Sequence, residues 1–115
     1  MARATIEVKP RIVAKGRRAI GPGKADLLDQ IRSTGSISAA AKAMAMSYSR
    51  AWQLVDTMNN SFKEPLVEAE TGGKRGGGAR VTEAGAAVLA KYRAMQTALE
   101  AEAAHHLAKF EALLR

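Results

Sequence analysis

The chain has 115 residues, of which 18 are Lys or Arg and 11 are Asp or Glu, so its formal net charge is +7. Hydrophobic residues make up 47% and charged residues 25%, which fits one small folded domain and excludes a disordered chain. The absence of cysteine excludes disulfide frameworks, thiolate zinc sites and cysteine nucleophiles.

Positive charge is concentrated at the start of the chain. Residues 1–25 contain seven basic residues and one acid, Glu7, and so carry +6 of the total. Such a segment attracts a polyanion through counterion release, and it equally fits a solvated N-terminus. Aromatic residues are 4% of the chain, too few for the stacking surfaces of single-strand binders, so a nucleic-acid partner is expected to be double-stranded DNA.

Membrane and export signals are not expected. The longest apolar or small stretch, residues 84–90, is far shorter than the ~20 residues that a membrane span needs. The basic N-terminus is not followed by an apolar block, so no secretory signal is expected. These patterns favour a soluble, cytoplasmic protein.

The first predicted elements are an edge strand and a helix. Apolar and polar residues alternate in residues 5–9, β-type residues continue to Val13, and Pro10 favours an edge strand with a break. Leucine and isoleucine then recur at helical spacing in residues 24–31, and Gly35 is expected to end this helix.

A helix-turn-helix pattern follows. Ser36 is a good N-cap for a helix over residues 37–45, and Ser47 is a good N-cap for a second helix over residues 48–62. The second helix has an apolar stripe and an opposite polar face. A short helix, a tight turn and a longer amphipathic helix together predict a helix-turn-helix.

Two aromatic residues of the second helix have open interpretations. Trp52 borders the apolar stripe, so core packing is favoured over a functional role. Tyr48 lies in the first turn, where contact with a phosphate and packing on the core are equally compatible with the pattern.

A β-hairpin is predicted after Pro65. Residues 66–70 and residues 79–81 are β-type, and the segment between them holds five of the ten glycines. Lys74 and Arg75 lie in the middle of this glycine-rich tip. A flexible linker is the alternative, but the flanking strands favour a hairpin.

Thr82 is expected to cap a final helix that continues to Arg115. Apolar side chains recur along it every three or four residues, over a length that a small domain cannot cover completely. A second copy of the chain is the natural cover, so a homodimer is expected, although the helix could instead fold back or fray beyond Glu100. The predicted dimerisation residues are Val88, Tyr92, Met95, Leu99, His106, Phe110 and Leu113.

No residue set supports an enzyme, a metal site or a cofactor. Residues 18–25 look superficially like a phosphate-binding loop but lack its first Gly and its Ser/Thr. Glu102 and His105 have Glu-x-x-His spacing, yet no matching carboxylates occur elsewhere, and adjacent His105 and His106 are ~100° apart on a helix. We therefore expect no catalytic residues, no metal ligands and no cofactor.

Two groups of motifs resemble the N-terminal DNA-binding domain of the molybdate-responsive ModE regulators. Ser-Tyr-x-x-Ala-Trp at residues 47–52 and Thr-Gly-Gly-Lys-x-Gly-Gly-Gly at residues 71–78 are fairly specific. Looser elements, Ser-x-x-x-Ala-Ala at residues 36–41 and Val-Thr-x-x-Gly at residues 81–85, are shared with LysR-type regulators, the related alternative. The resemblance covers roughly residues 24–90.

The resemblance implies a mainly α fold with a small β-hairpin wing, namely a winged helix-turn-helix plus a long C-terminal dimerisation helix. Residues 1–82 would form the DNA-binding domain with its N-terminal strand, and residues 83–115 would form the dimerisation helix. The family binds operator DNA as a dimer and binds molybdate in domains beyond this helix. Because the sequence ends at Arg115, no such sensor domain is expected here. Ser49-Arg50 departs from the best-known Lys-Ser pattern, so a different base preference is expected.

The resulting hypothesis is a transcriptional regulator of the ModE type that binds an inverted-repeat DNA operator and is linked to molybdenum-related genes. The second helix would enter the major groove, and the wing would contact the neighbouring backbone. The alternative is a protein-interaction module without specific DNA readout. The candidate DNA-binding residues are Ser36, Ser47, Tyr48, Ser49, Arg50, Gln53, Lys74, Arg75 and Arg80.

Overall fold

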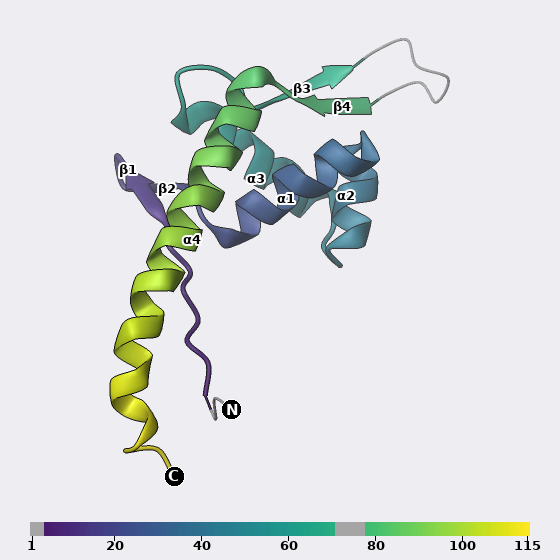
Figure 1. Cartoon of the computed structure of the whole chain (residues 1–115). Helices are drawn as coiled ribbons and strands as arrows, with labels where there is room; N and C mark the ends of the chain where they lie inside the picture. Colours follow the sequence, from purple (N-terminus) through teal and green to yellow (C-terminus); the bar gives the residue numbers. More distant parts are fainter. Residues whose placement is uncertain (1–3, 71–77) are drawn as a thin grey trace.

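The computed structural model describes residues 4–70 and 78–115, which form a mainly helical fold with two small β-hairpins (Figure 1). The predicted winged helix-turn-helix with a long terminal helix is confirmed. In chain order the elements are β1 (Ile12–Ala14), β2 (Arg17–Ile20), α1 (Pro22–Thr34), α2 (Ile37–Ala43), α3 (Tyr48–Ser61), β3 (Val67–Glu70), β4 (Gly78–Val81) and α4 (Glu83–Glu111).

The N-terminal strand lies later in the chain than the sequence predicts. Residues 5–9 form no strand, whereas β1 pairs antiparallel with β2, Ile12 opposite Ile20. Lys15 and Gly16 make the tight turn between them with φ of 51° and 74°. The expected strand over residues 5–9 is therefore wrong, whereas its β-type continuation to Val13 lies within β1, because the two-residue turn selects residues 12–14 as the partner of β2.

Helix α1 begins two residues before the predicted start. Pro22 occupies its first turn, where a missing N–H costs nothing. Gly35 ends the helix as predicted, in the left-handed conformation (φ 73°), and its N–H donates to the carbonyl oxygen of Ile31 at 2.7 Å. Leu27, Leu28 and Ile31 point into the core and are fully buried.

The helix-turn-helix has the predicted caps. The Ser36 hydroxyl accepts a hydrogen bond from the Ala39 N–H, and the Ser47 hydroxyl accepts one from the Arg50 N–H, both at 3.0 Å. Between the helices Ala45 takes a left-handed conformation (φ 54°), which reverses the chain.

The wing strands β3 and β4 pair in register, with Glu68 opposite Arg80 and Ala69 opposite Ala79. Thr82 caps α4 by accepting the Gly85 N–H at 3.0 Å, as predicted. A Cβ at Gly85 would lie 2.2 Å from the Leu66 carbonyl oxygen, so only glycine lets α4 start this close to the wing.

Helix α4 runs from the base of the wing past the helical body, and its second half projects away from it (Figure 1). It ends at Glu111, not at Arg115, and the chain measures 58 Å along its longest axis. Arg93 fixes it to α1 by donating to Asp26 at 2.8 Å and to Asp29 at 2.6 Å. These hydrogen bonds raise the pKa of Arg93 above its usual value.

The predicted dimerisation residues divide into two groups. Tyr92 is only 2% exposed, so its assignment to a dimer interface is corrected: the side chain belongs to the core of its own chain. Val88 and Met95 also pack partly against that core. The exposed members lie further along, where Leu99 is 42% and Phe110 57% exposed.

Candidate nucleic-acid interface

The outer face of α3 presents the predicted polar residues to solvent. Ala51, Val55 and Met58 turn inward and are buried. The exposed side chains of its first turns are those of Tyr48, Ser49, Arg50, Trp52, Gln53 and Asp56. The first turn contains no acidic residue, so the positive end of the helix dipole is not neutralised there. This surface can therefore donate hydrogen bonds and attract anions.

Ser36 and Ser47 cap the N-termini of α2 and α3. Each uses a hydroxyl lone pair for its cap and keeps its O–H available as a donor to an external acceptor. Ser47 is exposed and Ser36 half-buried. Both could donate to a phosphate without breaking the cap.

A cleft of about 310 Å³ separates α3 from the base of the wing. Three segments border it: the start of α2, the exposed side of α3 and the paired wing strands. The lining residues are Ser36, Ile37, Ser38, Tyr48, Trp52, Val55, Val67, Ala69, Gly78 and Ala79. Helix α3, the candidate recognition helix, and the wing thus border the same cleft.

Trp52 is exposed, contrary to the core packing that the sequence favours. The side chain is 45% exposed, and Tyr48, for which the sequence left two interpretations open, is 52% exposed. Tyr48, Trp52 and Asp56 recur every four residues, which places all three on one helix face. The charged Asp56 in that row is the signal that could have identified the face as exposed.

The described part of the wing carries one predicted cation, Arg80, and pairs it internally. Its guanidinium lies 2.7 Å from a Glu68 oxygen and 3.7 Å from a Glu70 oxygen. The predicted free contact of Arg80 with phosphate therefore has two competing carboxylates. Lys74 and Arg75 lie outside the described residues.

A second group of cations lies near the start of α3. The Lys24 ammonium donates to the Arg18 carbonyl oxygen at 2.5 Å. Burial lowers the pKa of Lys24, and the positive charges of Arg18 and Arg50 lower it further. The sequence marked the N-terminal segment as basic, but could not show that the charge of Arg50 acts on Lys24.

Asn59 positions the wing relative to α3, a role that sequence reasoning missed. Its side-chain oxygen accepts the N–H groups of Leu66 at 2.8 Å and Val67 at 3.2 Å, and its amide donates to the Val67 carbonyl at 3.0 Å. One side chain thus completes the first backbone hydrogen bonds of β3. Asn59 therefore joins the start of the wing's first strand to α3 through three hydrogen bonds.

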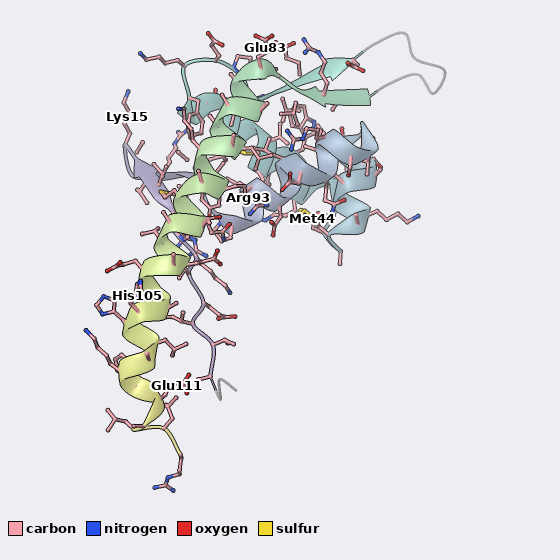
Figure 2. The ribbon with its side chains drawn as sticks, in the orientation of Figure 1. Lys15, Met44, Glu83, Arg93, His105 and Glu111 are labelled. Carbon is pink, nitrogen blue, oxygen red and sulfur yellow. The ribbon has the colours of Figure 1, made fainter. Side chains whose placement is uncertain are left out.

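The described residues form neither a metal-ion site nor a membrane-spanning helix. No group of His, Asp and Glu side chains within residues 4–70 and 78–115 is placed to hold a metal ion. None of the described helices is both long and apolar enough to cross a bilayer. His106 instead pairs with Glu102 at 3.5 Å, on the projecting part of α4 where Figure 2 shows His105.

Curated proteins similar to this chain are regulators and molybdenum-binding proteins. "Molybdenum-pterin-binding protein MopA" of Rhodobacter capsulatus is 45% identical over 84 residues, which are 73% of this chain and 32% of the relative. "Transcriptional regulator ModE" of Yersinia pestis is 41% identical over 93 residues, which are 81% of this chain and 33% of the relative. The chain therefore spans about one third of the length of the curated relatives it matches.

Solved structures share the fold. A complex of the CbnR DNA-binding domain with DNA matches with a TM-score of 0.59 at 20% identity, over 76% of this chain and 94% of that chain. ArgP from Mycobacterium tuberculosis matches with a TM-score of 0.51 at 24% identity, over 76% of this chain and 30% of that chain. At these identities the likeness shows the fold alone.

The family model described as "Bacterial regulatory helix-turn-helix protein, lysR family" matches residues 24–86, from α1 into the first turn of α4. This range contains the helix-turn-helix and the wing, including the motifs on which the sequence resemblance depends. The chain therefore belongs to the lysR family of bacterial regulatory helix-turn-helix proteins, with ModE-type regulators among its relatives.

Proposed function

We propose that the chain is a transcriptional regulator that binds double-stranded DNA in a sequence-specific manner. The observation that supports this most directly is the shared cleft between the exposed face of α3 and the base of the wing. In this arrangement α3 enters the major groove and the wing reaches the adjacent backbone. The names of the relatives add support, since several are transcriptional regulators.

The contacts divide between base readout and phosphate binding. Ser49, Arg50 and Gln53 project from the first turns of α3, where short polar and bidentate side chains reach base edges. Lys74 and Arg75 supply phosphate contacts from the wing, as the sequence predicts. Asp56 repels phosphate, so only the first half of α3 inserts deeply.

The experiment is selection of binding sites from random duplex DNA at a fixed salt concentration. Gln53→Ala or Arg50→Ala should change the selected sequence, because each good base contact contributes about 1–3 kcal/mol. Lys74→Ala with Arg75→Ala should weaken binding to all DNA sequences alike. Lys63→Ala, an exposed cation beyond the far end of α3, is the control and should change neither. Uniform loss from both sets would contradict the division, and no selected sequence at all would favour a protein-interaction module.

The regulator acts as a homodimer through α4 in this proposal. Leu99 and Phe110 are eleven residues apart, which places them ~20° apart around the helix, and both are substantially exposed. Pairing of two such helices would cover them and predict an inverted-repeat operator. Leu99→Glu with Phe110→Glu should reduce the sedimentation mass to that of a monomer, whereas Ala101→Glu on the opposite face should not. A wild-type mass that is monomeric at every concentration would contradict the dimer.

The regulated genes are proposed to concern molybdenum. The relatives are named for molybdenum transport or molybdenum-pterin binding, and the shared residues include the helix-turn-helix. Sequencing of the genomic DNA that the chain captures tests this point. Capture of fragments unrelated to molybdenum genes would contradict it while leaving DNA binding intact.

A further inference from the structure

Two aromatic side chains form a ridge on the exposed face of α3. Tyr48 and Trp52 border the cleft toward the wing and also the open face that carries Ser49, Gln53 and Asp56. Their spacing of four residues stacks them along one row of the helix. Any ligand that lies along the outer face of α3 must therefore contact them.

The surroundings of Trp52 indicate a ligand of mixed polarity. Its side chain is 45% exposed, and within the described residues its indole N–H has no hydrogen-bond partner. Its neighbours differ on the two sides of the ridge: Ser49, Gln53 and Asp56 on the open face are polar, whereas the cleft toward the wing is lined mainly by apolar residues. The floor of a DNA major groove presents apolar methyl groups beside hydrogen-bonding groups. A narrow apolar ridge with polar side chains beside it is complementary to such a surface.

Thymine offers the apolar group that such a ridge can recognise. In the major groove, thymine presents a 5-methyl group beside a carbonyl acceptor, while Gln side chains pair well with the N6 and N7 atoms of adenine. Gln53 follows Trp52 directly and borders the same open face. The two side chains are thus placed for adjacent features of A·T base pairs.

We propose that Trp52 reads sequence by packing its indole ring on a thymine methyl group in the major groove, beside Gln53. This assignment rests on the proposed function, because it requires α3 to enter the groove. It predicts at least one thymine in each selected half-site whose methyl group contributes to affinity.

The test replaces thymine by uracil, position by position, in the duplex that the wild-type chain selects. At one position of each half-site the loss of the methyl group should weaken binding about threefold to fivefold. Trp52→Ala should bind more weakly and should no longer distinguish thymine from uracil there, because the two changes remove the same contact. Val13→Ala, which removes an exposed apolar side chain of β1, should keep the full thymine preference.

Fluorescence provides an independent reading. Trp52 is the single tryptophan of the chain, so its emission should be quenched or shifted when the selected duplex is added. Equal affinity for all uracil-substituted duplexes, or a thymine preference that persists in Trp52→Ala, would overturn the assignment while DNA binding stood. Failure of the chain to select any duplex would overturn the proposed function as well.

Discussion

The Gly35 carbonyl oxygen accepts a hydrogen bond from the Ala79 N–H at 2.9 Å, which joins the turn before α2 to wing strand β4. Gly35 directly precedes the Ser36 cap, and Ala79 lines the cleft opposite it. The bond therefore connects the helix-turn-helix to the wing base without any side chain. Together with the Asn59 contacts to β3, it holds both wing strands against the helical body.

Gly78 is placed to test this connection. A Cβ on Gly78 would lie 2.9 Å from the Gly35 carbonyl oxygen, which is backbone and has little freedom to move. Gly78→Ala should push β4 away and destabilise the fold by about 1–3 kcal/mol, measured by urea unfolding. Gly23→Ala is the control, because its Cβ meets nothing within 4 Å in the first turn of α1. It should be neutral or stabilising by up to about 1 kcal/mol, and equal losses in both variants would contradict the close contact.

Asn59→Ala should destabilise the chain by about 1–3 kcal/mol, because it leaves part-buried N–H groups of residues 66 and 67 without their acceptor. Asn60→Ala is the matched control. Asn60 is exposed, and its amide makes only a local bond to the Asp56 carbonyl at 2.9 Å within the helix. Urea unfolding measures both variants, and hydrogen exchange of β3 should increase in Asn59→Ala alone. Unchanged protection of β3 would contradict this role of Asn59.

These contacts mark where sequence reasoning succeeded and where it stopped. Ser36, Ser47 and Thr82 were predicted as caps because capping depends on local sequence, within three residues. The bridge from Asn59 to β3 joins a side chain to backbone atoms across a turn, and no periodic pattern records it. Trp52 was misplaced because its position borders both faces of α3, and only packing decides which face is buried. The pairing of β1 with β2 was also missed, because it depends on the turn between the two strands.

The Tyr92 hydroxyl donates to the Pro10 carbonyl at 2.8 Å and so ties the N-terminal segment to α4. Burial raises the pKa of Tyr92, so the folded state favours the neutral phenol. The unfolded chain therefore ionises first as pH rises above about 10, and the stability contribution present below that pH is progressively lost above it. Tyr92→Phe should cost about 1 kcal/mol at neutral pH and reduce this alkaline loss.

The absorbance of tyrosinate checks the Tyr92 assignment. In a Tyr48→Phe background Tyr92 is the remaining tyrosine, so its titration is read alone. A midpoint at or below the usual tyrosine value would contradict the buried, hydrogen-bonded phenol.

The ion pairs of Arg80 indicate how DNA binding should change when the carboxylates of the wing base are removed. Glu68→Gln with Glu70→Gln should strengthen duplex binding several-fold at low salt, because two negative charges leave the DNA-facing hairpin and Arg80 is freed. The gain should shrink as salt rises. Glu100→Gln with Glu102→Gln on the exposed part of α4 removes the same two negative charges and should have a much smaller effect. Binding isotherms at several salt concentrations measure the three proteins. An equal gain from the Glu100→Gln, Glu102→Gln control would assign the effect to net charge and not to the wing.

We expect the Lys24 ammonium to contact a DNA phosphate beside the start of α3. The carbonyl of Arg18 holds its ammonium, and the Arg18 and Arg50 charges lie close enough to lower its pKa, so the three cations form one positive field beside the start of α3. Lys24→Ala should reduce the slope of log K against log salt by about 0.9 without changing the selected sequence. Lys15→Ala is the lysine control, since Figure 2 shows Lys15 pointing into solvent at the turn of the β1–β2 hairpin. Because the pKa of Lys24 is lowered, its contribution should also fade at a lower pH than that of an ordinary lysine. An unchanged slope in Lys24→Ala would restrict the DNA contacts to α3 and the wing.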